Sequence, residues 1–223
     1  MKNIVITGAS KGIGKAIAQA FAEDKQGNCL FLCARNKEAL HETAVNLQKR
    51  FPRAQIEVKA CDMSNENEVK DFANWVLSFQ KPIHILINNA GQFVSGSVHN
   101  EPEGLLQKLM AINLYSAYQL TRLLLPHMMP NKKGHIFNIC SIASLNAYAN
   151  GGAYSISKFA MMGFSKNLRE EMKPYNIKVT TIYPGATATD SWNENEVDFS
   201  KMLQPEDIAK IIYTCSELST QAV

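Results

Sequence analysis

The chain has 223 residues, of which 46% are hydrophobic, enough for the core of one large domain or two small ones. Its net charge of +3 is spread along the chain without a basic block or an acidic tail, which argues against a nucleic-acid-binding surface. No apolar run reaches the ~18 residues of a membrane-spanning helix and no signal-peptide pattern is present, so we expect a soluble, cytoplasmic protein.

A glycine-rich turn follows the first predicted strand, Ile4-Val5-Ile6, and leads into an amphipathic helix from Lys15 to about Glu23. Glycine lets a backbone approach a phosphate without a Cβ in the way, and a helix N-terminus favours anions. The spacing G-x-x-x-G-x-G differs from the G-x-G-x-x-G fingerprint, and the turn lacks the Gly-Lys-Ser/Thr of a P-loop. The residues predicted to bind dinucleotide phosphates are Gly8, Ser10, Lys11, Gly12, Ile13 and Gly14.

The second predicted strand, residues 29–34, ends at Arg35. In a doubly wound sheet this position faces the adenosine ribose, where an acidic residue binds a 2′-hydroxyl and an arginine accommodates a 2′-phosphate. Arg35 and Lys11 together are expected to clamp that phosphate, which favours NADP(H) over NAD(H). The alternative is that Arg35 is a solvated loop residue.

Two further strand ends follow in the chain. A helix from about 36 to 50 precedes a strand at 56–61, after which Asp62 either caps the next helix or contacts the adenine edge; Ser64 or Asn65 is better placed to cap. After a helix at about 66–79, the strand 83–87 stops at a stretch of small and amide-bearing residues, 88–91, which can pack beside a flat ring.

The second half of the chain carries the candidate proton donors. Asn113 lies within a long predicted helical region, about 103–128, where an asparagine is mildly unfavourable and needs a polar partner. Ser141 ends a strand at 135–141. Tyr154 and Lys158 lie one turn apart on a helix that ends near Lys173, so their side chains share a face.

A tyrosine and a lysine on one helix face suggest acid–base chemistry. A free phenol has a pKa near ~10, and a nearby ammonium favours the phenolate and lowers that pKa. A lowered pKa would let Tyr154 exchange a proton with a substrate oxygen near neutral pH. Taken alone, the pattern is more simply a helix with one exposed Tyr and one exposed Lys.

The last predicted strand, 177–183, ends at Pro184-Gly185, and a final helix runs from Pro205 to about Leu218. Between them, the polar segment 186–202 is a candidate lid, anchored by Trp192 and Phe199. The pocket is expected to be shaped by the segment 186–203 together with Phe93, Val94, Asn146 and Tyr148.

Six strands thus alternate with helices, which predicts an α/β protein: a single doubly wound, Rossmann-type domain over residues 1–223, with a mainly parallel sheet and helices on both faces. Such sheets bind ligands at the carboxyl ends of their strands. The five cysteines and five histidines lack metal-ligand spacing, so no metal is expected.

The chain resembles the short-chain dehydrogenase/reductase family along nearly its whole length. The motifs that carry the resemblance are Thr7-Gly8-Ala9-Ser10-Lys11-Gly12-Ile13-Gly14, Asn88-Asn89-Ala90-Gly91, Asn113, Ser141, Tyr154, Lys158 and Pro184-Gly185. Family members usually run somewhat longer and add a seventh strand after the last helix, so the recorded sequence is expected to lack a tail. The segment 190–207 looks closer to sepiapterin-reductase-like and carbonyl-reductase-like members than to 3-oxoacyl-carrier-protein reductases.

The resemblance implies a role for each motif residue. Tyr154 would be the general acid/base, Ser141 would polarise the substrate carbonyl, and Asn113 would anchor a relay water. Lys158 would lower the phenol pKa and hold the nicotinamide ribose. The further cofactor contacts implied are Asp62 and Met63 with adenine, Asn89, Ala90 and Gly91 with the adenosine-side ribose, and Pro184, Gly185, Thr187 and Thr189 with the nicotinamide end.

The predicted function is NADPH-dependent reduction of a ketone or aldehyde. The alternatives are a 3-oxoacyl-thioester reductase and a non-enzymatic NADP(H)-sensing module; a sensor has no need of a proton donor with a pKa-lowering neighbour. A sugar-nucleotide epimerase would require an added substrate domain, for which the chain leaves no room. The expected partners are a small carbonyl substrate and further copies of the chain, as a dimer or tetramer, with no nucleic acid and no membrane.

Overall fold

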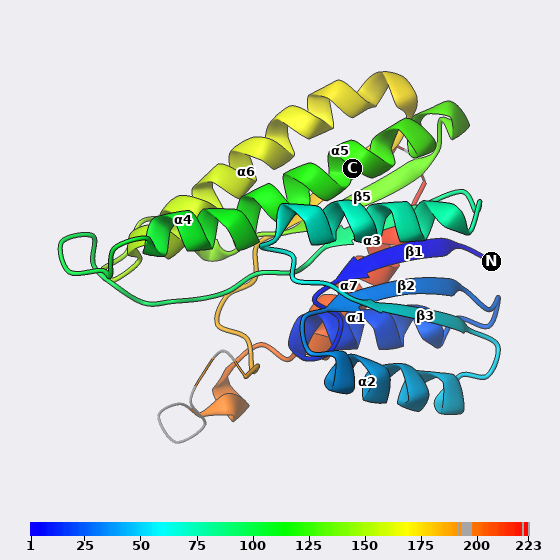
Figure 1. The fold of residues 1–223 in the computed structure, drawn as a ribbon, viewed down its shortest axis with the longest axis horizontal. Coiled ribbons are helices and arrows are strands. Elements are labelled where there is room, and N and C mark those ends of the chain that lie inside the picture. The colour runs from blue at the N-terminus through cyan, green and yellow to red at the C-terminus, as the bar shows by residue number, and fades with distance from the viewer. Residues whose placement is uncertain (191, 193–197, 220, 223) are drawn as a thin grey trace.

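The computed structural model describes residues 1–190, 192, 198–219 and 221–222. Its strands form one parallel sheet in the order β3-β2-β1-β4-β5-β6 (Figure 1). The strands are β1 (Asn3–Thr7), β2 (Cys29–Ala34), β3 (Gln55–Ala60), β4 (Ile85–Asn88), β5 (Gly134–Ile139) and β6 (Ile177–Ile182). The sheet topology confirms the predicted doubly wound α/β fold.

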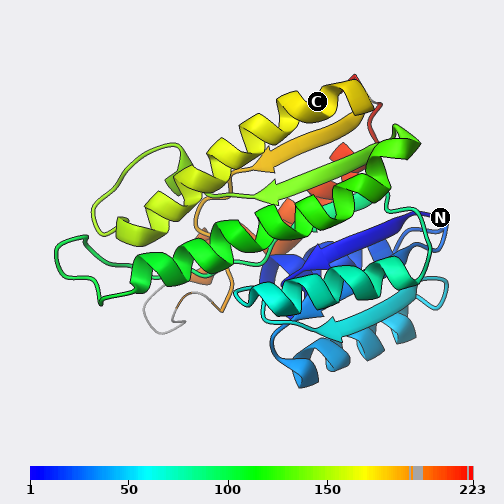
Figure 2. The same ribbon diagram turned by 45° about the horizontal axis from the view of Figure 1, so that its top comes forward.

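The helices lie in two layers on opposite faces of the sheet (Figures 1 and 2). One layer comprises α1 (Gly12–Ala22), α2 (Lys37–Arg50) and α7 (Pro205–Glu217). The other comprises α3 (Glu66–Ser78), α4 (Leu105–Met110), α5 (Ser116–Met128) and α6 (Gly152–Met172). A five-residue π-helix, η1 (Ala111–Tyr115), joins α4 to α5.

Alternating side chains of the central strands divide the core between these layers. Ile4 and Ile6 of β1 pack with residues of α1 and α7, whereas Val5 packs with residues of α3 and α5. All five residues of β1 and all six of β2 are buried. Strands covered on both faces are mainly apolar, which is why these short runs were recognisable in the sequence.

Most predicted element boundaries agree with the structure, and the differences have local causes. Helix α1 begins at Gly12 rather than Lys15, because the Lys15 amide already donates to the Lys11 carbonyl, at 3.2 Å. Asn65 caps α3 by accepting hydrogen bonds from the amides of Asn67 and Glu68. Strand β5 ends at Ile139, so Ser141 lies two residues beyond it.

The candidate lid at 186–202 is described only in part, since residues 191 and 193–197 lie outside the described residues. Its two ends are joined by backbone hydrogen bonds: the Ala188 amide donates to the Leu203 carbonyl at 2.9 Å, and the Leu203 amide donates to the Ala186 carbonyl at 3.0 Å. The two ends of the segment are therefore held together directly before α7 begins.

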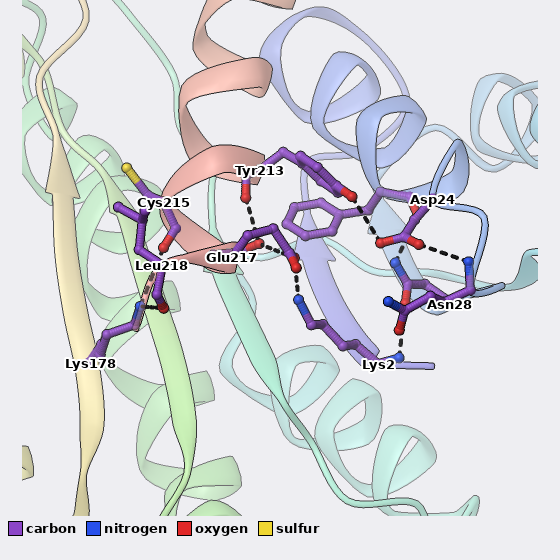
Figure 3. A network of polar contacts seen from close by, with 11 residues as sticks. Lys2, Asp24, Asn28, Lys178, Tyr213, Cys215, Glu217 and Leu218 are labelled. Carbon is purple, nitrogen blue, oxygen red and sulfur yellow. Dashed lines mark hydrogen bonds and ion pairs between the residues drawn. The ribbon is translucent and has the colours of Figure 1, made fainter. Parts of the chain in front are cut away.

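The C-terminal end of α7 is held by a buried lysine of β6 (Figure 3). The Lys178 ammonium donates to the Leu218 carbonyl at 2.9 Å and, at 3.3 Å each, to the carbonyls of Cys215 and Ser219. A cation there complements both the unpaired carbonyls and the negative end of the helix dipole. An ion pair between Lys2 and Glu217 adds an exposed contact at the same helix end.

We expect Lys178→Met to lower the free energy of unfolding by about 2–3 kcal/mol, because three hydrogen bonds from a charged donor to the carbonyls at this helix end are lost. The matched control is Lys2→Met, which removes an exposed ion pair at the same helix end and should cost about 1 kcal/mol or less. Urea denaturation of both variants measures the difference. Equal losses would contradict the assigned anchoring.

Candidate active site

A cavity of about 680 Å³ opens at the carboxyl ends of the strands, beside the point between β1 and β4 where the strand order reverses. This is the ligand site of open α/β sheets. Every residue predicted to contact the cofactor lines the cavity except Asp62, whose carboxylate instead accepts hydrogen bonds from the amide and hydroxyl of Ser64. Ser141 also lines it, whereas Asn113 lies behind its wall.

The glycine turn is tightly built. Gly8 and Gly12 have φ of +68° and +53°, a region that other residues rarely adopt. A Cβ on Gly14 would lie 2.2 Å from the Gly8 carbonyl oxygen and 2.5 Å from Nδ2 of Asn89. Positions 8 and 12 therefore need glycine for conformation, and position 14 needs it for space.

The end of β4 holds this turn in place. Nδ2 of Asn89 donates to the Thr7 carbonyl at 2.8 Å and to the Gly8 carbonyl at 3.2 Å. In return, the Thr7 hydroxyl accepts from the amides of Asn89 at 3.0 Å and Ala90 at 2.9 Å. Sequence reasoning placed Thr7 in the first family motif but assigned no such role to its hydroxyl.

The turn fits the phosphates of a dinucleotide. Gly12, Ile13 and Gly14, at the start of α1, lie in the cavity wall, and the side chain of Lys11, the residue before the helix, makes no capping hydrogen bond. Uncapped first-turn amides and the positive end of the helix dipole form a site for an anion. The close approach of the backbone at Gly8 and Gly14 leaves no room there for a side chain.

The two cations predicted to clamp a 2′-phosphate have different surroundings. Arg35 is exposed and lines the cavity directly after β2. Lys11 also lines the cavity, but its ammonium pairs with the Asp190 carboxylate at 3.0 Å. Both partners are largely exposed, so the pair is weak and Lys11 can exchange it for a phosphate. Nothing in the polar segment around Asp190 marked this contact in the sequence.

Ser141 and Tyr154 are brought together by the short turn after β5. The Ser141 hydroxyl accepts from the Ala143 amide at 3.1 Å, which fixes its side chain at the start of that turn. The turn is bonded to α6, because the Ser155 hydroxyl donates to the Ala143 carbonyl at 3.0 Å. Tyr154 precedes Ser155 in the first turn of α6, so both candidate donors face one cavity.

Burial raises the pKa of Tyr154, and hydrogen bonding with the Ser141 side chain opposes that rise. The Lys158 ammonium lies 6.0 Å from the Tyr154 ring centroid and donates to the Ile139 carbonyl at 3.0 Å. Burial lowers the pKa of Lys158 in turn. The lowering of the phenol pKa that the sequence pattern predicted is therefore not found in this structure, because burial of the phenol has the largest effect on that pKa.

Asn113 lies in η1, and its buried amide makes three hydrogen bonds. Oδ1 accepts from the Gln92 amide at 2.8 Å, while Nδ2 donates to the Gln92 carbonyl at 3.0 Å and to the Ser157 hydroxyl at 2.9 Å. Single π-turns inside helices occur often at functional sites. Both amide hydrogens are used here, so a relay water at this residue would bind its oxygen atoms.

An aromatic wall faces the catalytic candidates. The Phe93 ring packs edge-on against Tyr154 with centroids 4.9 Å apart, and its centroid lies 5.4 Å from that of Trp192. Tyr148 and Asn146 also line the cavity, as predicted, whereas Val94 packs against the hydrophobic core instead. The substrate side of the cavity is therefore largely aromatic.

The described residues contain neither a metal-binding cluster nor a membrane-spanning helix. Within that part of the chain, no cluster of three or more His, Cys, Asp or Glu side chains could hold a metal ion. None of the helices described has both the length and the apolar character needed to span a bilayer. All five cysteines are free thiols.

Comparison with known proteins agrees with this geometry. The profile of the short chain dehydrogenase family matches residues 2–198. Dehydrogenase/reductase SDR family member 7B of Xenopus tropicalis is 35% identical over 190 residues, which cover 83% of this chain and 61% of the Xenopus protein. A sepiapterin reductase of Chlorobaculum tepidum is 31% identical over 214 residues, covering 94% of this chain and 88% of that protein.

A solved structure is similar over the whole fold. L-Sorbose reductase from Gluconobacter frateurii, complexed with NADPH and L-sorbose, has a TM-score of 0.92 at 30% identity, covering 100% of this chain and 92% of that chain. The chain thus spans less than two thirds of the Xenopus protein but nearly all of the sorbose reductase. Because the family profile matches most of its length, the chain belongs to the short-chain dehydrogenase/reductase family of oxidoreductases.

Proposed function

We propose that the chain, as a single dinucleotide-binding and catalytic domain, reduces a ketone or aldehyde with NADPH as hydride donor. The observation that carries the proposal is one cavity whose wall contains both the glycine turn and the side chains of Ser141, Tyr154 and Lys158. A cofactor extended along this wall would bring its phosphates to the turn and its reactive ring to the two hydroxyl groups.

Bound NADPH would supply the hydride to the carbonyl carbon. As charge builds on the carbonyl oxygen, the Ser141 hydroxyl donates a hydrogen bond and Tyr154 donates the proton that completes the alcohol. Lys158, held by the Ile139 carbonyl, offers its remaining hydrogens to the nicotinamide ribose and stabilises the phenolate left on Tyr154. Asn113 holds Gln92 and Ser157 in place behind these groups.

The proposal is tested by following NADPH oxidation with a panel of diketones, aldehydes and 3-oxoacyl thioesters. Turnover of ketones or aldehydes is the expected result, and the aromatic wall at Phe93 favours the bulkier members. Turnover restricted to thioesters would replace this substrate class with the thioester alternative. NADPH binding without reduction of any carbonyl would favour the non-enzymatic sensing module.

Arg35→Asp should reverse the cofactor preference from NADPH towards NADH. The substitution removes the cation expected at the 2′-phosphate and places a carboxylate where it repels that phosphate and accepts from a ribose 2′-hydroxyl. The measurement is the ratio of kcat/KM for the two cofactors. Lys37→Asp makes the same charge change two residues further on, at the start of α2, and serves as the control. An unchanged ratio in Arg35→Asp would refute the assigned contact.

We also propose that the chain forms a homo-oligomer. Exposed apolar side chains on α5 and α6 support this, among them Tyr118, Ile156 and Phe159, which are 46%, 45% and 38% exposed. Single exposed apolar residues are ordinary, but here they lie on two adjacent helices of one layer (Figure 2). Sedimentation of the purified chain measures its assembly directly.

A further inference from the structure

Glu101 reaches from a distant loop to the start of α6. It lies in the segment between the end of β4 and α4, and its Oε1 accepts a hydrogen bond from the Ala153 amide at 2.8 Å. Ala153 is the second residue of α6, is fully buried, and directly precedes Tyr154. Sequence reasoning missed Glu101, because 52 positions separate the two partners and no motif includes it.

Two glycines make room for this carboxylate. A Cβ on Gly152 would lie 2.0 Å from Oε1 of Glu101, and one on Gly96 would lie 2.8 Å from Cγ of Glu101. Gly152 also has φ of +34°. The space around the carboxylate is therefore shaped by the backbone of both segments.

Further hydrogen bonds join the same two segments, which lie near each other at one end of the molecule (Figure 2). The Gly96 amide donates to the Asn150 carbonyl at 3.0 Å, and the Ser97 hydroxyl donates to Oδ1 of Asn150 at 2.6 Å. The loop that contains Phe93 is thereby attached to the N-terminal end of α6 close to Glu101.

The first turn of a helix is its least constrained part, because its amides have no partner within the helix. Tyr154 lies in this turn, so the position of its hydroxyl depends on whether the turn stays formed. A carboxylate that accepts from a first-turn amide supplies the missing partner and complements the helix dipole. Gly151, the residue before α6, has no side chain that could do so.

We propose that Glu101 is a positioning residue, which holds the first turn of α6 and thereby aims the Tyr154 hydroxyl at the substrate carbonyl. Glu101 acts through the Ala153 amide and touches no reacting atom. The inference rests on the proposed reductase function for its kinetic consequence, but its structural part, the closed first turn, can be tested without any turnover.

The experiment compares Glu101→Ala with Glu101→Gln, which keeps an acceptor oxygen, and with Glu103→Ala, which removes an exposed carboxylate two residues along. Hydrogen–deuterium exchange of a peptide spanning residues 150–158 measures the first turn of α6. In Glu101→Ala we expect faster exchange there and a fall in kcat of about 10- to 100-fold, the size of effect that a displaced catalytic group produces. The Kd for NADPH should change less than about twofold, because no cofactor contact is altered.

Glu101→Gln should restore slow exchange and most of kcat, and Glu103→Ala should resemble the wild type. Wild-type exchange in a folded Glu101→Ala variant, or a loss of kcat without faster exchange, would overturn the inference. If Glu101→Ala does not fold, Glu101→Asp, whose carboxylate is one methylene further from the amide, should show both effects in weaker form, and its failure to do so counts against the inference. If the wild type reduces no carbonyl but exchange in residues 150–158 is still faster in Glu101→Ala than in the wild type, the proposed function is rejected and the structural role of Glu101 stands.

Discussion

Tyr154→Phe is expected to lower kcat for carbonyl reduction by about 10²- to 10⁴-fold, the range that a positioned general acid contributes. The substitution removes the proton donor but keeps the ring that packs against Phe93, so the cavity retains its shape. The Kd for NADPH should change little. Stopped-flow measurement of NADPH oxidation, together with a fluorescence titration of cofactor binding, separates the two quantities.

Tyr148→Phe is the matched control, because Tyr148 lines the same cavity and loses the same hydroxyl. It should keep kcat within about threefold of the wild type, well below the loss expected for a general acid. Reduction requires the protonated phenol, so the wild-type rate should fall as the pH rises through the phenol pKa in the complex, and this limb should vanish in Tyr154→Phe. Comparable losses of kcat in Tyr154→Phe and Tyr148→Phe would contradict the assignment of Tyr154 as the general acid.

The second large effect is expected from Gly14→Ala. A Cβ there would lie 2.2 Å from the Gly8 carbonyl oxygen, so the backbone of the glycine turn must shift. We expect the affinity for NADPH to fall by about 10²-fold or more and stability to drop by about 1–3 kcal/mol, as in other overpacked sites. Cofactor titration and thermal unfolding measure these two losses.

Gly163→Ala provides the comparison, since this α6 glycine has no heavy atom within 4 Å of where its Cβ would lie. The same substitution should raise stability by up to about 1 kcal/mol through helix propensity and leave cofactor affinity unchanged. Tight NADPH binding by Gly14→Ala would show that the turn can relax, and that phosphate binding does not depend on its present shape.

Sequence patterns predicted the features that depend on residues close together in the chain, namely the strands and the residues that directly follow them. Apolar runs covered by helices on both faces give the parallel strands, and the residues after those strands meet at one edge of the sheet because all strands run the same way. This is why Arg35, Ser141 and Gly91, far apart in the chain, line one cavity. The family resemblance added roles to these positions, which stay predictions until the variants above are measured.

What the sequence did not reveal depends on contacts between distant segments or on solvent exclusion. The Lys11–Asp190 pair and the Glu101–Ala153 hydrogen bond join residues with no local signature. Asn113 was expected to have a polar partner, but a π-helix with Gln92 as that partner was not foreseeable from helix propensity. The raised pKa of Tyr154 arises from burial, which a one-turn spacing does not encode.

The bonds between Thr7 and Asn89 bear on the order in which the protein matures during synthesis. The glycine turn is complete only when β4 is placed beside β1, because the Asn89 side chain fixes the carbonyls of Thr7 and Gly8. Contacts between segments so far apart in the chain form late in folding, because closing the long loop between them costs conformational entropy. A nascent polypeptide released before residue 89 would therefore contain the whole glycine motif and still lack a finished nucleotide cradle.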